Sequence, residues 1–326
     1  MKHIFYLLII FSAITLKCGS SEKTNSEIPN FQIFESYNQI HILKNGRHFT
    51  SYLYDSIWLK PILYPVYSPS GIRVQRQYPL LIVEGESHDH PHHAGLSFTY
   101  GTEGEVNGYN FWAGQQGSTK IRHSRVTQMK AEPDFTILGI QAEWIGQEGE
   151  LVLEEDRTMI FKGDETKNII DFLLELKAYS EDVVFNDTKE GMFAIRVADW
   201  LSEANGNGTY LNSEGDESEE NIWGKPAKWV RLDGQHKGKT IGVLIMNHPS
   251  SVNYPTYWHA RAYGLFSANP LGREVFEKGR GIQDTTPLNF TIPAGNTAKF
   301  RFRMIIYEGE LVVDEIEDLF EQYMND

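Results

Sequence analysis

The stretch "KNIIDFLLELKAY" at residues 167–179 decides the fold class of this chain. Its apolar side chains recur at every second position, and most residues between them are charged. In an extended chain this spacing places the apolar side chains on one face, where they can be buried. The apolar face consists of Ile170, Phe172, Leu174, Leu176 and Ala178. The stretch therefore predicts a half-buried β-strand.

The same alternation returns in "KFRFRMIIYEG" at residues 299–309, where Arg301 and Arg303 separate apolar positions. Three shorter apolar runs also predict strands, and many are bounded by Gly, Pro, Asn or Asp, the residues that turns prefer. These runs are "PLLIVEG" (79–85), "TMIFKG" (158–163) and "TIGVLIMNH" (240–248).

One segment departs from the β pattern. In "LVVDEIEDLFEQYMND" (311–326) the apolar residues recur at helical spacing with acidic residues between them. No other segment predicts a helix as clearly. The fold prediction is therefore an all-β chain: a large antiparallel β-sandwich with one C-terminal helix.

The chain as a whole is acidic, with a formal net charge of −14 over 326 residues and no long run of Lys or Arg. Phosphate backbones are bound by clustered cations, so the composition argues against a nucleic-acid partner. An acidic stretch, "NSEGDESEEN" (212–221), predicts a solvated surface loop.

The N-terminus predicts export. Residues 4–16 form an apolar run behind Lys2, too short to span a bilayer but long enough for a signal peptide. Cys18, the single cysteine, follows this run and resembles a bacterial lipoprotein cleavage site, although Lys17 departs from the usual small residue. We therefore expect a signal peptide over 1–17, lipidation at Cys18, a tether over 18–30 and one β-sandwich domain over 31–326. The protein would be a periplasmic or outer-membrane lipoprotein, held to the membrane through a lipid anchor only.

Four segments combine polar and aromatic residues in a way that a core strand would not. They are "ESHDHPHHAGLSF" (86–98), "EVNGYNFW" (105–112), "NDTKEGMFAIRVADW" (186–200) and "NHPSSVNYPTYWHARAYGLFSANPLG" (247–272). Pro91 and Gly95 predict a turn before a strand in the first, and Asn107-Gly108 predicts a tight turn in the second. The fourth predicts a long loop.

These segments, with a late strand ending in "YEGE", resemble the PmoA-like family of exported bacterial proteins, often labelled methane oxygenase. The resemblance covers most of residues 60–310 in the same order. It implies a fold similar to the galactose-mutarotase-type supersandwich. The label implies a copper-dependent membrane oxygenase, which does not fit a chain without a spanning segment after its signal. Since the family's function is unestablished, the resemblance supplies no catalytic residue.

The histidines of residues 88–93 admit three interpretations. They could be metal ligands, an acid–base device or a hydrogen-bonded structural loop. Zinc or copper would need three or four ligands converging at about 2.0–2.3 Å, and no HExxH or CxxC spacing is present. The metal hypothesis uses a divalent ion and His88, His90, His92 and His93.

The preferred hypothesis is a carbohydrate-active enzyme that needs no cofactor and acts on a sugar or oligosaccharide by histidine–carboxylate acid–base chemistry. Hydrolysis, elimination and epimerisation stay open. The predicted catalytic residues are His92, His93, Glu190 and His259. The predicted substrate-binding residues are His90, Asn107, Trp112, Lys189, Arg196, Tyr257, Trp258, Arg261 and Tyr263.

Two alternatives remain beside it: a non-catalytic sugar-binding lipoprotein and a metal-dependent enzyme. Each of the three hypotheses places the histidine loop in a functional site. The shared-site hypothesis predicts that this loop, residues 187–196 and residues 257–263 form the walls of one cleft.

Overall fold

The computed structural model describes residues 30–113 and 119–326. Their strands form two eight-stranded sheets, and every named strand pair is antiparallel. The all-β prediction is confirmed. The predicted signal peptide, tether and Cys18 lie outside the described residues.

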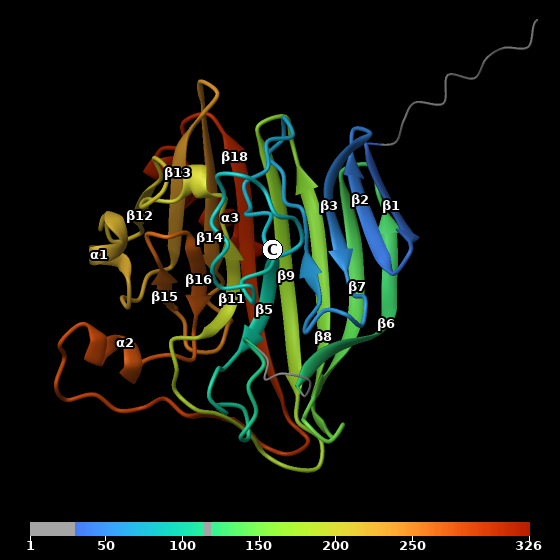
Figure 1. Ribbon diagram of the computed structural model, residues 1–326, viewed down its shortest axis with the longest axis vertical. Helices are drawn as coiled ribbons and strands as arrows, with labels where there is room; N and C mark the ends of the chain where they lie inside the picture. The colour runs from blue at the N-terminus through green and yellow to red at the C-terminus, as the bar shows by residue number, and fades with distance from the viewer. Residues whose placement is uncertain (1–29, 114–118) are drawn as a thin grey trace, which may run out of the picture.

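The first sheet, called here the β5 sheet, runs in the order β1-β2-β3-β4-β5-β11-β16-β15 (Figure 1). Its strands are β1 (Phe31–Ser36), β2 (Gln39–Lys44), β3 (Arg47–Leu53), β4 (Ile62–Leu63), β5 (Leu96–Tyr100), β11 (Gly191–Arg196), β16 (Leu265–Asn269) and β15 (Tyr257–Ala260).

The second sheet, called here the β9 sheet, runs in the order β12-β13-β14-β18-β9-β8-β7-β6. Its strands are β12 (Thr209–Asn212), β13 (Trp229–His236), β14 (Lys239–Asn247), β18 (Thr297–Glu308), β9 (Lys167–Lys177), β8 (Leu151–Gly163), β7 (Phe135–Ile145) and β6 (Lys120–Ala131). A small ribbon pairs β10 (Val183–Phe185) with β17 (Phe290–Ile292).

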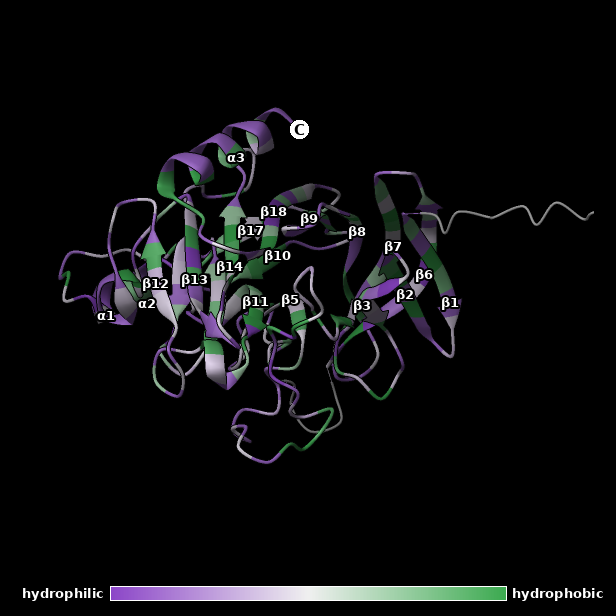
Figure 2. Ribbon diagram, turned by 90° about the horizontal axis from the view of Figure 1, so that it is seen from above, coloured by the Kyte–Doolittle hydropathy of each residue, from purple (hydrophilic) through white to green (hydrophobic). Residues whose placement is uncertain are grey.

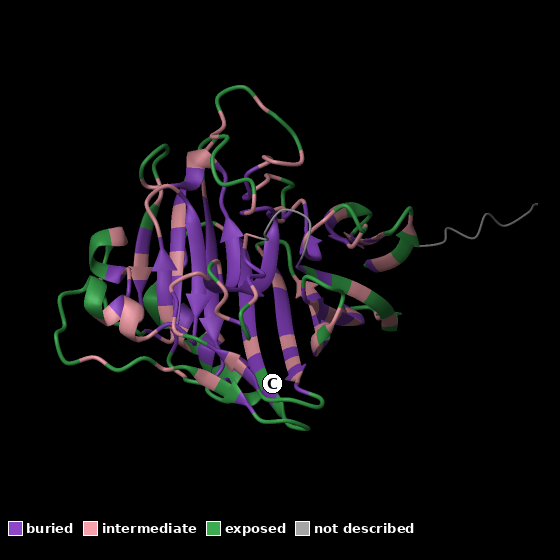
Figure 3. Cartoon of the chain, turned by 60° about the horizontal axis from the view of Figure 1, so that its bottom comes forward, coloured by how far each residue is buried: buried purple, intermediate pink, exposed green. Residues whose placement is uncertain are grey.

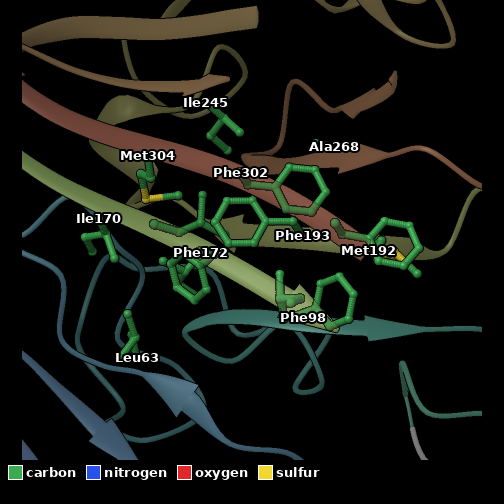
Figure 4. Packing of buried hydrophobic residues seen from close by; sticks show 14 of the residues in the cluster. Leu63, Phe98, Ile170, Phe172, Met192, Phe193, Ile245, Ala268, Phe302 and Met304 are labelled. Carbon is green, nitrogen blue, oxygen red and sulfur yellow. The ribbon is translucent and has the colours of Figure 1, made fainter. Parts of the chain in front are cut away.

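The core lies between the two sheets and follows from the alternation of the sequence. Phe172 of β9 and Phe302 of β18 contact Phe193 of β11 across this interface, and the rings of Phe193 and Phe302 are stacked with centroids 4.8 Å apart (Figure 4). Figure 3 shows the buried strand interiors and the exposed loops at their ends. Burial of these large side chains supplies the main stabilisation of the sandwich.

The C-terminal helix is also confirmed. α3 (Val313–Asn325) buries Ile316, Phe320 and Tyr323 against the outer face of the β9 sheet. Figure 2 shows α3 on one side of the sandwich, and the loops that precede β5 on the other side. Two short helices that the sequence did not indicate are α1 (Ser218–Ile222) and α2 (Glu274–Gly279). None of the helices in residues 30–113 and 119–326 combines the length and apolar character needed to span a bilayer.

Three local predictions were wrong. Residues 79–85 form turns with Leu81 and Ile82 exposed, because this apolar run crosses the surface rather than joining a sheet. Residues 257–269 form the β15–β16 hairpin rather than a loop, since backbone pairing satisfies their polar groups. The acidic stretch 212–221 contains α1, whose Glu219 binds Arg261.

Candidate functional site

A row of small side chains crosses the centre of the β5 sheet. The pairing register aligns Ser97 of β5, Ala194 of β11, Ser267 of β16 and His259 of β15. Their neighbours Phe98, Phe193, Phe266 and Trp258 belong to the core, so alternation turns the row toward the opposite, outer face. Three small residues therefore stand side by side across the strands, with His259 at the end of the row.

The histidine loop lies over this row, and its rings pack against one another. The rings of His90 and His93 are parallel with centroids 4.8 Å apart, and His90 stacks in the same way on Tyr263 at 5.3 Å. His92 meets His93 edge-on at 4.4 Å, and Trp112 meets His93 edge-on at 5.7 Å. Segments from three distant parts of the sequence therefore share one cluster, called here the ring cluster: His90, His92, His93, Trp112 and Tyr263.

Two arginines hold the loop to the sheet. Arg76 donates from Nη1 to Asp89 at 2.5 Å and from Nη2 to the His90 carbonyl at 3.0 Å. Arg196, at the end of β11, donates from Nη2 to the same Asp89 oxygen at 2.9 Å, and its guanidinium lies 4.5 Å from the centroid of Tyr263. Both arginine side chains are at most 1% exposed, whereas Asp89 is 44% exposed.

A small cavity of about 10 Å³ lies between the sheet and this loop, roughly the space for one water molecule. Ser97, Ala194 and Leu265 form its floor, and His92, His93, Trp112, Arg196 and Lys60 also line it. Several buried polar atoms at this place have no hydrogen-bond partner among the described residues. They are His93 Nδ1, Trp112 Nε1, and Nε and Nη1 of Arg196. Buried polar groups are normally satisfied, so these atoms mark a place prepared for water or a ligand.

Lys60 is the residue of this site that the sequence analysis missed. It is 5% exposed, and its ammonium donates to the carbonyls of His92 at 3.1 Å and Trp112 at 2.6 Å. Burial lowers the pKa of Lys60 to about 7. Arg76 was missed as well. The one available signal for Lys60 was a lone cation in the apolar run "IWLKPILYP"; Arg76 had none.

Burial also keeps the histidines neutral near pH 7. Desolvation, followed by the charge of Lys60, lowers the pKa of His92 to about 4. Desolvation and the neighbouring His92 and His90 lower the pKa of His93 strongly. Each ring is therefore unprotonated near pH 7 and has a lone pair to offer, but its low pKa makes it a weak base until a bound anion raises that pKa.

His259 stands at the other end of the small-residue row. Its Nδ1 lies 2.9 Å from the Lys189 carbonyl, so Nδ1 carries the proton and Nε2 keeps a free lone pair. Nε2 is buried without a partner in the described part of the chain. Burial, only partly offset by Glu190, lowers the pKa of His259 to about 4.

Glu190 is half-buried beside these groups and forms an ion pair with Lys189. Arg196 binds Asp89 of the histidine loop, the Lys189 carbonyl lies 2.9 Å from His259, and Tyr263 stacks on His90. These contacts support the predicted proximity of the three wall segments.

Three aspartates of the polar segments, Asp89, Asp187 and Asp199, have structural roles. Asp187 accepts backbone N–H groups at the start of α2, and Asp199 accepts from the backbone and hydroxyl of Ser87. Asp89 binds the two arginines. Burial raises the pKa of Asp89, but Arg196, His90 and Arg76 together outweigh it and hold the pKa below its ordinary value.

Three predicted substrate-binding residues lie away from the ring cluster. Trp258 is a core residue whose indole donates to the Ala227 carbonyl, because alternation along β15 turns it inward. Asn107 forms the predicted tight turn and bonds to Val184 and Asp182 beside β10. Tyr257 donates to Glu277 and stacks on Phe276 of α2.

The structure does not favour the metal hypothesis. His88 lies apart from the other three histidines, tilted against the ring of Tyr78 with its Nε2 at 3.3 Å from the Val83 carbonyl. Across residues 30–113 and 119–326, no group of three or more His, Cys, Asp and Glu side chains is arranged to hold a metal ion. Parallel stacking of His90 on His93 turns their faces, rather than their nitrogens, toward each other.

A wider groove adjoins the ring cluster. Its volume is about 600 Å³, and it is lined by Trp223 and Glu219 from the α1 region, Arg280 beyond α2, and Arg261. Arg261 pairs with Glu219 at 2.5 Å, and its guanidinium lies 5.4 Å from the centroid of Tyr263. The groove is therefore in contact with the ring cluster through Arg261.

Comparison with known families identifies the family of this chain but no activity. A model described as a family of unknown function (DUF6807) matches residues 39–321. The chain belongs to this family. No curated protein matches the sequence. The sequence resemblance to PmoA-like proteins stays a prediction.

Solved structures similar to this family member include sugar epimerases and their relatives. Galactose 1-epimerase from Lactobacillus acidophilus NCFM is 9% identical, with 86% of this chain and 99% of that chain covered and a TM-score of 0.41. A galactose mutarotase-like protein from Clostridium acetobutylicum is 8% identical, with 86% and 95% covered and a TM-score of 0.39. Similarity at this level carries no conclusion about activity, so the functional argument rests on the site itself.

Proposed function

We propose that this protein is a carbohydrate-active enzyme that moves a proton to or from a sugar at the outer face of the β5 sheet. The observation that carries the proposal is the cavity beside the ring cluster, where His93 Nδ1 and two nitrogens of Arg196 are buried without partners among the described residues. Flat rings of Trp112 and Tyr263 beside such polar groups suit the C–H faces and hydroxyls of a sugar.

His92 or His93 acts as the proton acceptor, and His259 with Glu190 forms the opposing side. Each imidazole is unprotonated at neutral pH and has a lone pair for the proton, and a substrate anion beside the rings would raise their low pKa values toward those of an effective base. Arg196, Arg261 and Lys60 orient the sugar or stabilise negative charge that develops on its oxygens.

This arrangement supports elimination or epimerisation rather than glycosidic hydrolysis. Glycosidases generally use two carboxyl groups facing one bond, one of them protonated. Here Asp89 is held as an anion by Arg76 and Arg196, and Glu190 is paired with Lys189. Two histidine-based groups on either side of a sugar can exchange a proton without a second free carboxylate.

The groove beside Arg261 supports a substrate longer than one sugar ring. Its volume of about 600 Å³ is in the range of ordinary ligand sites, and Trp223 gives it an aromatic wall. We propose that further sugar residues occupy it while the reacting unit contacts the ring cluster.

We also propose that the enzyme is exported and anchored by lipid at Cys18. The apolar run of residues 4–16 and the single cysteine support this proposal. Exchange of Cys18 for Ser should release the protein from the membrane fraction; equal retention of both forms would contradict it.

The experiment for the enzymatic proposal is a turnover screen of oligosaccharides, neutral and acidic, read by NMR of the sugar protons. His93→Gln should lose at least 100-fold in rate because it removes the base. His236→Gln, at the end of β13 and outside the ring cluster, is the matched control and should keep full rate. Sugar binding with no turnover of any substrate would contradict the enzymatic proposal.

A further inference from the structure

The two buried arginines beside the ring cluster hold more positive charge than the carboxylate they share can balance. Arg76 and Arg196 are each at most 1% exposed, whereas Asp89, which serves both, is 44% exposed. Lys60 is buried beside them, with its amine at the carbonyls of His92 and Trp112 and over the Trp112 ring. Asp199 also acts on Arg76, but both of its oxygens accept from Ser87. Buried charges are normally paired, so this excess calls for an anionic ligand.

Most of the unpartnered atoms at this place are hydrogen-bond donors. Arg196 Nε and Nη1, Arg76 Nε and Trp112 Nε1 can only donate hydrogen bonds, and none has an acceptor in the described ranges. His93 Nδ1 can donate or accept, depending on its tautomer. A neutral sugar hydroxyl would both donate and accept, whereas a group that only accepts would match the free donors of Arg196 and Trp112, the two of these residues that line the cavity.

We propose that the substrate is an acidic sugar, a uronic acid unit, whose carboxylate is bound by Arg196 with support from Lys60 and Trp112. This inference rests on the proposed function and adds the substrate class. The cavity lined by these three residues has space for about one water-sized group, which fits a single carboxylate oxygen better than a bulkier phosphate or sulfate. The guanidinium of Arg196 supplies charge-assisted hydrogen bonds, the stronger kind for a carboxylate.

The same contacts would prepare the sugar for proton transfer. Neutralising the carboxylate makes the hydrogen on its neighbouring carbon, C5, more acidic. His92 or His93 takes that proton, and the electron pair of the broken C–H bond moves toward the carboxylate carbon. In elimination that pair then forms the C4–C5 double bond, while O4 leaves with its own bonding pair and receives a proton. In epimerisation a proton returns to C5 from the other face. Both outcomes balance without an oxidant, a reductant or a cofactor.

The test compares matched sugars on the folded protein. Calorimetry would measure the binding of an oligogalacturonide, its methyl ester, and the neutral galacto-oligosaccharide of the same length. Two parallel series would use oligosaccharides that contain glucuronate or mannuronate. A sugar phosphate would be tested as a further ligand. For at least one series the free acid should bind at least tenfold more tightly than its ester. In D₂O, NMR should show deuterium at C5 if the acid is epimerised, or the unsaturated C4–C5 product if O4 is eliminated.

Arg196→Met should reduce the preference for the acid over the ester to within about twofold. Arg122→Met is the matched control. It removes an exposed arginine of β6 that pairs with Glu143, and it should leave the preference for the acid unchanged. Circular dichroism and urea unfolding would establish that both variants are folded. If Arg196→Met does not fold, Arg196→Lys replaces it, with a smaller preference expected because the planar group is lost.

The outcomes separate this inference from the proposed function. Neutral sugars or esters that bind and react as well as the acids would overturn the acidic-substrate inference and leave the sugar enzyme standing. Preference for the sugar phosphate over the uronates would also overturn it. Absence of binding and turnover with every sugar would overturn the proposed function itself, and the inference with it.

Discussion

The two outer faces of the sandwich each bury an arginine beside a tyrosine, but the two arginines differ in how many carboxylate contacts balance their charge. On the β9 sheet, Arg303 lies 4.3 Å from the ring of Tyr323 of α3 and donates two hydrogen bonds to Asp171, at 2.5 and 2.9 Å, and one to Asp326. On the β5 sheet, Arg196 lies 4.5 Å from the ring of Tyr263 but shares one half-exposed carboxylate with Arg76.

The difference separates a structural arginine from a functional one. Burial alone would lower the pKa of Arg303, yet Asp171 and Asp326 together raise it, so its charge is fully compensated. Burial, reinforced by Arg196, lowers the pKa of Arg76 on the opposite face. Buried charge without full compensation costs stability and is best explained by a ligand that completes the site.

The histidines repeat this contrast. His248 on the α3 side has its Nδ1 bonded to Ser250 and its Nε2 at 3.2 Å from Arg301. His259 on the other side has one nitrogen bonded to Lys189 and the other free of any partner within the described residues. A ring with both nitrogens bonded positions its neighbours, whereas a ring with one free nitrogen can accept a proton.

The largest effect should come from the paired arginine. Arg303→Met leaves Asp171 buried and poorly compensated, so the free energy of unfolding should fall by about 3–5 kcal/mol. Arg196→Met removes unpartnered donors and leaves Asp89 bound to Arg76, so its loss should stay within about 1 kcal/mol. Urea unfolding of both variants checks this. Equal losses would show that the two faces are equally structural.

The two tyrosines should differ in the same way as the two arginines, with a larger effect on stability at Tyr323 and a larger effect on binding at Tyr263. Tyr323→Leu should cost about 2–3 kcal/mol in unfolding free energy, because the ring is 1% exposed and fixes α3 to the sheet. Tyr263→Leu should cost less than 1 kcal/mol but weaken sugar binding about tenfold, because its partly exposed ring stacks on His90. Thermal unfolding and calorimetric titration measure the two quantities. A Tyr263→Leu protein that binds sugar normally would remove this ring from the site.

Lys60 should make the free energy of unfolding depend on pH in the alkaline range. Its folded pKa of about 7 lies below the ordinary lysine pKa of 10.5, so between these values the unfolded chain binds a proton that the folded protein lacks. Stability therefore rises with pH across this window. From pH 7.5 to 9.5 the wild type should gain about 2 kcal/mol relative to Lys60→Met. Parallel pH profiles of urea unfolding for the two proteins would contradict a neutralised Lys60.

His259 should give the smallest effect, in mild acid. Its folded pKa of about 4 lies below the ordinary histidine pKa of 6.5, so stability contributed by the neutral ring is present above pH 6.5 and is lost as the pH falls toward 4. Between pH 6.5 and 5.5 the wild type should lose about 1 kcal/mol more than His259→Gln. His88→Gln, on the exposed part of the histidine loop, is the control and should follow the wild type.

Most of the site could be located from the sequence, but not its charge balance. The clustered histidines, Trp112, Arg196 and Tyr263 stood out because polar and aromatic residues interrupted the apolar alternation. Trp258 was misassigned because a loop was expected where β15 forms, and strand alternation then turned its ring into the core. Asn107 was misassigned because a tight-turn signal says nothing about where the turn lies.

The sequence by itself determined the long strands and the C-terminal helix: period-two alternation requires half-buried strands, and the final helical spacing requires one apolar face on a sheet. Only the tertiary structure decided which charges are paired. Arg303 and Arg196 both end up buried, yet strand pairing brings Asp171 to one, while Arg76 and the histidine loop reach the other. Compensation of a buried charge depends on atoms within a few ångströms that belong to distant segments, and spacing along one segment cannot specify them.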